Sequence, residues 1–120
     1  MNAHRIVDIL LEDEDFDMES YVIAALTPLE AYNMAKDNPE LRPQLERVIA
    51  TSARYSYGYA RYYLKGKPFP LGEPAIATSA EYSYYYALDV LKGHFPAGEP
   101  AIATDRYYAS MYNDRFGTSI

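Results

Sequence analysis

The chain has 120 residues, of which 49% are hydrophobic and 23% are charged, a balance that predicts one globular domain. It contains no cysteine, which excludes disulfide bonds and thiolate metal sites. The net charge of −6 arises in the front half, where residues 1–50 hold 11 acids and 4 bases, and this argues against direct binding of nucleic acid. No apolar stretch is long enough to cross a membrane and the start has no signal-peptide pattern, so we expect a cytoplasmic protein.

Residues 1–42 are expected to form a helical cap at the N-terminal end. An amphipathic pattern predicts short helices over residues 3–11 and 18–26. A third helix is predicted to begin at Thr27, where Thr-Pro-Leu-Glu has the spacing of a capping box, and to end near Asp37.

An acidic segment separates the first two of these helices. It covers residues 12–19 and is expected to be exposed and mobile, because its carboxylates repel one another. Asp13, Asp15 and Asp17 have the alternate spacing that opens a calcium loop. Met18 and Ala24 stand where the loop requires Gly and Glu, so no metal site is expected. The segment is a candidate acidic contact for a partner through Glu12, Asp13, Glu14, Asp15, Asp17 and Glu19.

The remainder of the chain is a tandem repeat. Residues 50–66 match residues 77–93 at 12 of 17 positions, and residues 68–78 match residues 94–104 at 9 of 11. A decayed third copy follows, up to residue 117. A fixed period in the twenties predicts stacked units that bury their faces only against neighbouring units.

These observations predict an all-α fold in a single domain over residues 1–120. Residues 43–117 are expected to form a short, solenoid-like array of helix-turn-helix units of about 27 residues, behind the cap of residues 1–42.

Each unit is expected to contain a short and a long helix. Gly-Glu-Pro at residues 72–74 places proline in the first turn of a short helix that ends near Ala77. Residues 78–81 (TSAE) then have capping-box spacing for the long helix. Leu-Lys-Gly ends the long helix, with Gly66 and Gly93 predicted in the left-handed conformation. The alternating tyrosines also suit β-strands, but these start and stop signals favour helices.

A helical wheel divides the long helix into two faces. Positions that stay the same between the copies, such as Tyr59 and Tyr86, share one face, which we predict to be the core. The positions that differ form one continuous arc, which we predict to face solvent. The arc consists of the pairs Arg54/Glu81, Gly58/Tyr85, Arg61/Leu88 and Tyr62/Asp89. Stacking of the units is expected to bring Arg54 near Glu81.

The solvent arc carries the predicted partner-binding patch. Tyr85 and Leu88 are three residues apart and are expected to touch on one helix surface. Side-by-side stacking would add Arg61 and Tyr62, giving an aromatic and aliphatic centre with a basic edge. Exposed tyrosine is enriched at protein interfaces, so we predict that these four residues bind a partner.

No arrangement of residues indicates catalysis, a cofactor or a metal. His94 stands where the other copy has Pro68, so the repeat does not require an imidazole at that position. Glu73 and Glu99 recur and have the chemistry of an acid–base pair, but a glutamate in a first helical turn complements the helix dipole, which explains both. We expect that the chain is not an enzyme.

The block LKGxFPxGEPAIAxD, followed by a Tyr/Ala-rich stretch, resembles tandem-repeat proteins of tailed bacteriophages and some bacteria. Residues 91–105 carry the block and, one residue longer, so do residues 64–79. The resemblance implies a small phage accessory protein made in the cytoplasm of an infected bacterial cell. It implies no particular activity.

Three functions fit these features. The first is non-enzymatic binding of a host or phage protein, and its narrower form is inhibition of a bacterial defence system, in which the acidic half occludes a nucleic-acid site. The second is binding of a small, nucleotide-like ligand by tyrosines between repeats. The third is a structural role through self-association of the units. No membrane partner is expected.

Overall fold

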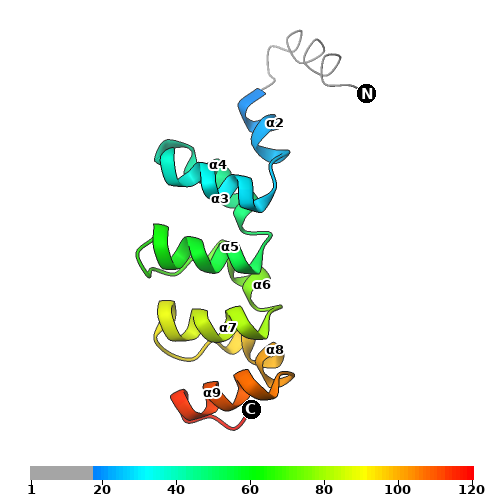
Figure 1. Cartoon of the computed structure of the whole chain (residues 1–120), viewed down its shortest axis with the longest axis vertical. Coiled ribbons are helices and arrows are strands. Elements are labelled where there is room, and N and C mark those ends of the chain that lie inside the picture. The colour runs from blue at the N-terminus through cyan, green and yellow to red at the C-terminus, as the bar shows by residue number, and fades with distance from the viewer. Residues whose placement is uncertain (1–17) are drawn as a thin grey trace.

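The computed structural model describes residues 18–120, and these residues fold into helices without a strand (Figure 1). The predicted all-α class is therefore confirmed. The structure is elongated and measures 59 × 28 × 20 Å along its principal axes. In Figure 1 three helices lie one below another: α5 (Ala53–Gly58), α7 (Ala80–Tyr86) and α9 (Arg106–Phe116). The predicted helix over residues 3–11 and the acidic residues 12–17 lie outside the described residues.

In the described part of the chain the repeats are preceded by α2 (Met18–Ala24) and α3 (Pro28–Asp37). The predicted capping box at the start of α3 is confirmed. The Thr27 hydroxyl accepts the backbone N–H of Glu30 at 3.1 Å, and the Glu30 carboxylate accepts the backbone N–H of Thr27 at 2.8 Å. These two bonds satisfy amide groups that have no partner inside the helix.

Three short helices alternate with α5, α7 and α9. We call these three the long helices, because α5 and α7 each continue into a further turn. A single 3₁₀ turn comes before each short helix. The short helices are α4 (Arg42–Ile49), α6 (Glu73–Ile76) and α8 (Glu99–Ala103), and the turns are Pro39–Leu41, Pro70–Gly72 and Pro96–Gly98. Figure 1 shows α6 between α5 and α7, and α8 between α7 and α9. None of the helices in the described part of the chain is long and apolar enough to span a membrane.

The repeated geometry begins earlier than the sequence comparison indicates. Asn38, before the first 3₁₀ turn, has φ −131° and ψ 71°, and Phe69 has φ −122° and ψ 79° at the equivalent place. The likeness is hidden in the sequence because α4 has eight residues and α6 has four, which adds about one helical turn. The first copy therefore has the same turn and short helix as the others, in a longer form.

The starts of the long helices differ from the predicted capping box. Ser52 and Ser79 are the N-caps, and their hydroxyls accept the backbone N–H groups of Tyr55 and Tyr82. Thr78 instead donates its hydroxyl to the carbonyl of Ala75 at 2.7 Å. The reason is that Thr78 lies in the turn that follows the short helix, where its backbone N–H also bonds to the carbonyl of Ala75, so the long helix begins one residue later than predicted.

A left-handed glycine was predicted after each of α5 and α7, and only the one after α5 is found. Each helix continues into a wider, π-type turn, Tyr59–Tyr63 and Ala87–Leu91. Gly66 is left-handed, with φ 82°, as predicted. The prediction for Gly93 was wrong, because Lys92 takes the left-handed conformation in its place, with φ 52°. The first loop is one residue longer and reverses through two left-handed residues, Lys65 and Gly66, whereas the shorter second loop reverses through one.

Successive copies approach closely where a serine meets a glycine. Ser56 and Ser83 are fully buried and donate their hydroxyls to the carbonyls of Ile49 and Ile76. A Cβ atom added at Gly72 would lie 2.6 Å from the Cβ of Ser56, a distance that real Cβ atoms do not show. Gly98 stands in the same relation to Ser83, again at 2.6 Å. The glycine of Gly-Glu-Pro is therefore required by helix packing and not only by the turn.

A buried tyrosine joins the short and long helices within each copy. The Tyr86 hydroxyl donates to the Glu73 carboxylate at 2.6 Å and accepts the backbone N–H of Phe69 at 3.0 Å. Tyr112 makes the same two bonds, to Glu99 at 2.5 Å and from Phe95 at 3.0 Å. In the first copy the Tyr59 hydroxyl donates to Glu46 at 2.6 Å. We call each such arrangement a tyrosine clamp.

Candidate interaction surface

The structure separates the four residues of the predicted patch into two pairs. Arg61 and Tyr62 lie on the surface, and Tyr62 is 64% exposed. The Arg61 guanidinium lies over the Tyr62 ring, 5.5 Å from its centroid, which is a cation–π contact. This half of the patch has the exposure that the sequence predicted.

Tyr85 and Leu88, by contrast, are half-buried and pack against the core. The prediction that the whole variable arc faces solvent was therefore wrong, and Gly58 on the same arc is buried as well. The physical reason is that α7 has a neighbour on each side, α5 and α9, so a residue that points away from one part of the core still meets another helix. The expected approach of Arg54 to Glu81 is not among the ion pairs of the described residues.

Tyr85 belongs to a connected row of aromatic rings that crosses from α5 to α9. Its ring centroid lies 6.1 Å from that of Tyr57 on α5 and 6.0 Å from that of Tyr108 on α9. Tyr82 extends the row at one end, 5.8 Å from Tyr57, and Tyr107 extends it at the other, 4.9 Å from Tyr108. We call these five residues the tyrosine row: Tyr57, Tyr82, Tyr85, Tyr107 and Tyr108.

The tyrosine row is only partly covered by the rest of the molecule. Tyr107 is 64% exposed, and the other four rings are half-buried. Offset and edge-to-face ring pairs at these distances are favourable, so each ring restricts the motion of the next. The result is an aromatic surface that is both accessible and held in place.

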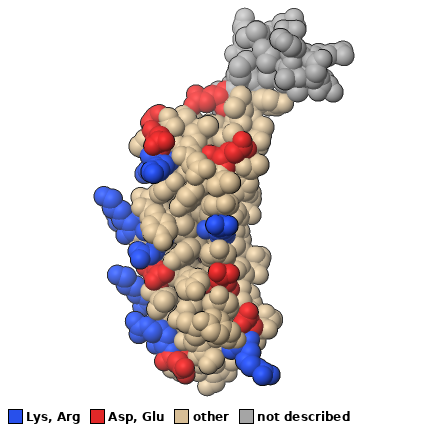
Figure 2. All heavy atoms as spheres, in the orientation of Figure 1, with Lys and Arg blue, Asp and Glu red and all other residues tan. Residues whose placement is uncertain are grey.

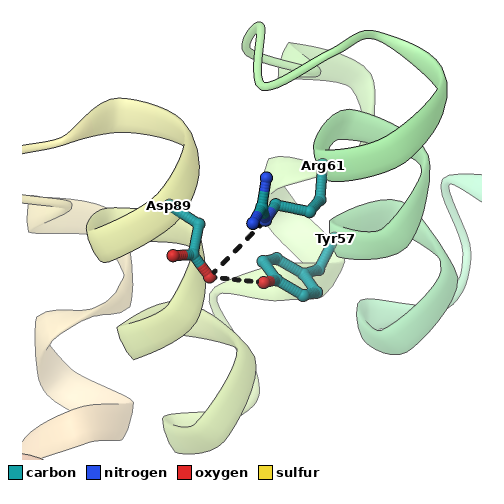
Figure 3. A network of polar contacts seen from close by, with 3 residues as sticks. All are labelled: Tyr57, Arg61 and Asp89. Atoms are coloured by element: carbon teal, nitrogen blue, oxygen red, sulfur yellow. Dashed lines mark hydrogen bonds and ion pairs between the residues drawn. The ribbon is translucent and has the colours of Figure 1, made fainter.

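A polar network fixes Tyr57 and connects α5 to the end of α7 (Figure 3). The Tyr57 hydroxyl donates to Asp89 at 2.5 Å, and the same carboxylate oxygen lies 4.0 Å from Nε of Arg61. Figure 3 shows both side chains pointing toward Asp89 from one helix. Asp89 replaces Tyr62 of the first copy, so this substitution on the variable arc forms a contact between copies.

The hydroxyls of Tyr57 and Tyr108 are uncharged at neutral pH, because the pKa of each is raised above its usual value. Burial, together with the hydrogen bond to Asp89, raises the pKa of Tyr57 well above its usual value. Burial, with a smaller contribution from Tyr85, raises the pKa of Tyr108 to about 12. The Tyr57 hydroxyl already donates its hydrogen bond to Asp89, so toward a partner it can only accept a hydrogen bond.

The glutamates considered as an acid–base pair are engaged elsewhere. Glu73 and Glu99 accept the hydroxyls of Tyr86 and Tyr112 in the tyrosine clamps. His94 lies beside the carbonyl of Phe116, 3.1 Å from Nε2. Within residues 18–120 no three acidic or histidine side chains are grouped as metal ligands, and no buried side-chain polar atom lacks a partner.

The described surface carries nearly balanced charge. Residues 18–120 contain 11 acids and 10 bases, whereas residues 1–17 contain six acids and one base. Figure 2 shows Lys and Arg side chains along one long edge of the molecule with acidic side chains among them. Glu19 is the one residue of the candidate acidic contact that the structure describes, and it is exposed on α2. The other five lie in the part that is not described.

Sequence reasoning missed Tyr107 and the role of Gly58. Tyr107 occupies the second position of its helix, as Arg54 and Glu81 do in theirs, and all three are exposed. This shared position was a usable signal in the sequence. Gly58 gave no signal, because its effect depends on a ring from another helix, Tyr32 of α3.

No protein-family model, curated protein or solved structure matches the chain.

Proposed function

We propose that the chain is a non-enzymatic protein-interaction module whose contact surface is the tyrosine row with Tyr62 and Arg61 beside it. One observation carries the proposal: five tyrosine rings from three helices are in contact with one another and remain partly exposed. Packing between helices accounts for the half-buried rings, but not for the two rings that are 64% exposed, Tyr107 in the row and Tyr62 beside it.

The chemistry of this surface suits a protein partner. Tyrosine and arginine are enriched at interfaces and among the residues that contribute most to binding. Rings that neighbouring rings already hold lose little conformational entropy when a partner binds. The nearly balanced charge of residues 18–120 gives no large positive surface of the kind that attracts phosphates.

A narrower form of the proposal is inhibition of a bacterial defence protein. It is supported by the resemblance to phage repeat proteins and by the acidic segment of residues 12–19. In this form the tyrosine row supplies affinity and the acidic segment faces a basic site on the partner.

Site-specific photo-crosslinking tests the general proposal. A benzophenone amino acid is placed at Tyr62 or Tyr107, which are each 64% exposed, and each variant is irradiated in a bacterial lysate. The control carries the same group at Leu71, which is 52% exposed and lies in a loop turn away from the row. We expect the same crosslinked protein from both row positions and none from the control.

The outcome that contradicts the proposal is equal crosslinking from all three positions, or none from any of them. A crosslink between two copies of the chain from the row positions would identify self-association as the function of the surface. Sedimentation velocity of the unmodified protein distinguishes this case from a separate partner.

A further inference from the structure

An aromatic hollow lies between the long helices, beside the tyrosine row but distinct from its centre. Its volume is about 260 Å³. Tyr32 of α3, Tyr55 and Tyr57 of α5, and Tyr82 of α7 form its walls, Gly58 lies at its base and Arg54 lies at its rim. The hollow therefore opens between three helices and is lined mainly by ring faces and edges.

The hollow includes a position, Gly58, at which the next copy of the repeat has Tyr85. At the equivalent position of the next copy the Tyr85 ring contacts Tyr57, Tyr84 and Tyr108 and fills the space between helices. At Gly58 an added Cβ would already lie 3.0 Å from the Tyr32 hydroxyl. The two copies thus provide an open and a filled version of the same place in the fold.

The rim of the hollow carries a positive charge. Arg54 is exposed, and its guanidinium lies 5.5 Å from the centroid of the Tyr55 ring. It makes no ion pair with any residue between 18 and 120. The equivalent residue of the next copy is Glu81, so the filled version has the opposite charge. Both substitutions at this place make the first copy more suitable for an anion beside an aromatic ring.

The walls of the hollow are held in position without a ligand. The Tyr32 ring is stacked on Tyr63, with centroids 4.6 Å apart, and the Tyr63 hydroxyl donates to the Tyr32 carbonyl at 2.8 Å. The Tyr57 hydroxyl is bound to Asp89. Among the rings that line the hollow, only Tyr62, at its edge, is mostly exposed. A preformed site of this kind does not require its walls to be ordered when a ligand binds.

We infer that this hollow binds a small molecule made of a planar aromatic ring and an anionic group. The ring lies between the tyrosine side chains, and the anionic group lies against Arg54. The volume is below that of a site for a drug-sized ligand, so it suits one ring system rather than several. Aromatic rings stack on tyrosine with little dependence on ring identity, so the charge beside the ring provides the selectivity. The hollow shares Tyr57, Tyr62 and Tyr82 with the proposed protein-contact surface, but the inference rests on a different observation, the hollow beside Gly58 and Arg54.

Ligand titration followed by amide NMR shifts tests the inference on the full chain. The probes are phenyl phosphate, phenol and inorganic phosphate, each taken to roughly 10 mM, since a ligand with few atoms binds in the millimolar range. We expect phenyl phosphate to shift the Gly58 amide and its neighbours, and to bind at least about ten-fold more tightly than either phenol or phosphate alone.

Two variants and a control locate the site. Arg54→Glu introduces the residue that the next copy has at the equivalent position. It should weaken phenyl phosphate binding by at least about ten-fold. The helix should stay stable, because a glutamate in the first turn complements the helix dipole. Gly58→Ala places a methyl group at the base of the hollow and should also weaken binding. Arg106→Glu makes the same charge change on α9, away from the hollow, and should leave binding unchanged.

The inference is overturned if inorganic phosphate binds as tightly as phenyl phosphate, if no amide around Gly58 shifts, or if Arg54→Glu and Arg106→Glu have equal effects. Adenosine monophosphate in a parallel titration distinguishes two sources of the ligand. Binding at least about ten-fold tighter than that of phenyl phosphate identifies a nucleotide, and equal binding identifies a simpler aromatic acid.

Discussion

The long helices α5 and α7 are the same on one side and different on the other. Their buried sides carry identical residues, Ser56 and Tyr59 in α5 and Ser83 and Tyr86 in α7, with the same hydrogen bonds to the short helix before each. Their other sides meet neighbouring helices through Gly58 in one case and Tyr85 in the other. The repeat therefore keeps the residues that join the short and long helices within a copy, and it varies the residues that lie between the long helices of neighbouring copies.

The largest effect is expected where two copies touch through glycine. Gly98→Ala should lower the free energy of unfolding by about 3 kcal/mol, because the new methyl group would overlap Ser83 and Phe95 in a packed interior. Urea denaturation measures the change. The matched control is Gly58→Ala, which meets only the end of the Tyr32 side chain and gains helix propensity of about 1 kcal/mol. Equal losses for the two variants would show that the copies do not approach closely at Gly98.

A smaller loss is expected from the variable side of α7. Tyr85→Ala combined with Leu88→Ser should lower the unfolding free energy by about 2–3 kcal/mol, because both side chains are half-buried between helices. Thermal denaturation of the double variant measures it. Tyr62→Ala, at a 64% exposed position of the first copy, should change stability by less than about 0.5 kcal/mol. A double variant as stable as the wild type would place the whole arc in solvent.

The tyrosine clamps of the two copies should differ in strength. Tyr86→Phe should cost about 2 kcal/mol, since it leaves the buried N–H of Phe69 and the Glu73 carboxylate without their partner. Tyr59→Phe should cost about 1 kcal/mol, because only the bond to Glu46 is lost. Urea denaturation of both variants checks the order. The reverse order would mean that the second hydrogen bond of the clamp contributes nothing.

The smallest difference is expected at the two helix ends. Gly66→Ala should cost about 1 kcal/mol, because an alanine is strained at a φ of 82°. Gly93→Ala should cost less than about 0.5 kcal/mol, because Gly93 is not left-handed. Differential scanning calorimetry on the two variants resolves this gap. Equal costs would indicate that both glycines reverse the chain in the same way.

The sequence predicts local structure here better than it predicts contacts between helices. The capping box at Thr27 and the left-handed Gly66 depend on residues close in the chain, and both are as predicted. The burial of Tyr59 and Tyr86 followed from comparing copies and is also confirmed. These features need no knowledge of neighbouring helices.

The residues that were misplaced depend on more distant parts of the chain. A single helical wheel assumes one buried side, whereas α7 is covered from both α5 and α9, which is why Tyr85 is not outward. Gly93 differs from Gly66 because the segment that follows it, up to Phe95, is one residue shorter than the segment between Gly66 and Phe69. The hollow at Gly58 could not be predicted for the same reason, since its rings come from three helices. Tyr107, by contrast, contacts Tyr108 of its own helix and could have been found from its position in that helix.

The tyrosine clamp has a consequence for how the chain can change in length. Each clamp is closed within one copy, because the tyrosine hydroxyl binds a glutamate 13 residues before it and, in two copies, a backbone N–H 17 residues before it. No clamp needs a residue from another copy. Insertion or removal of a whole copy therefore leaves every remaining clamp complete and changes only the number of gaps between layers. Each added copy also adds one position equivalent to Gly58 and Tyr85, which can hold a glycine or a tyrosine. The number of copies therefore sets how many hollows of this kind such a chain can form.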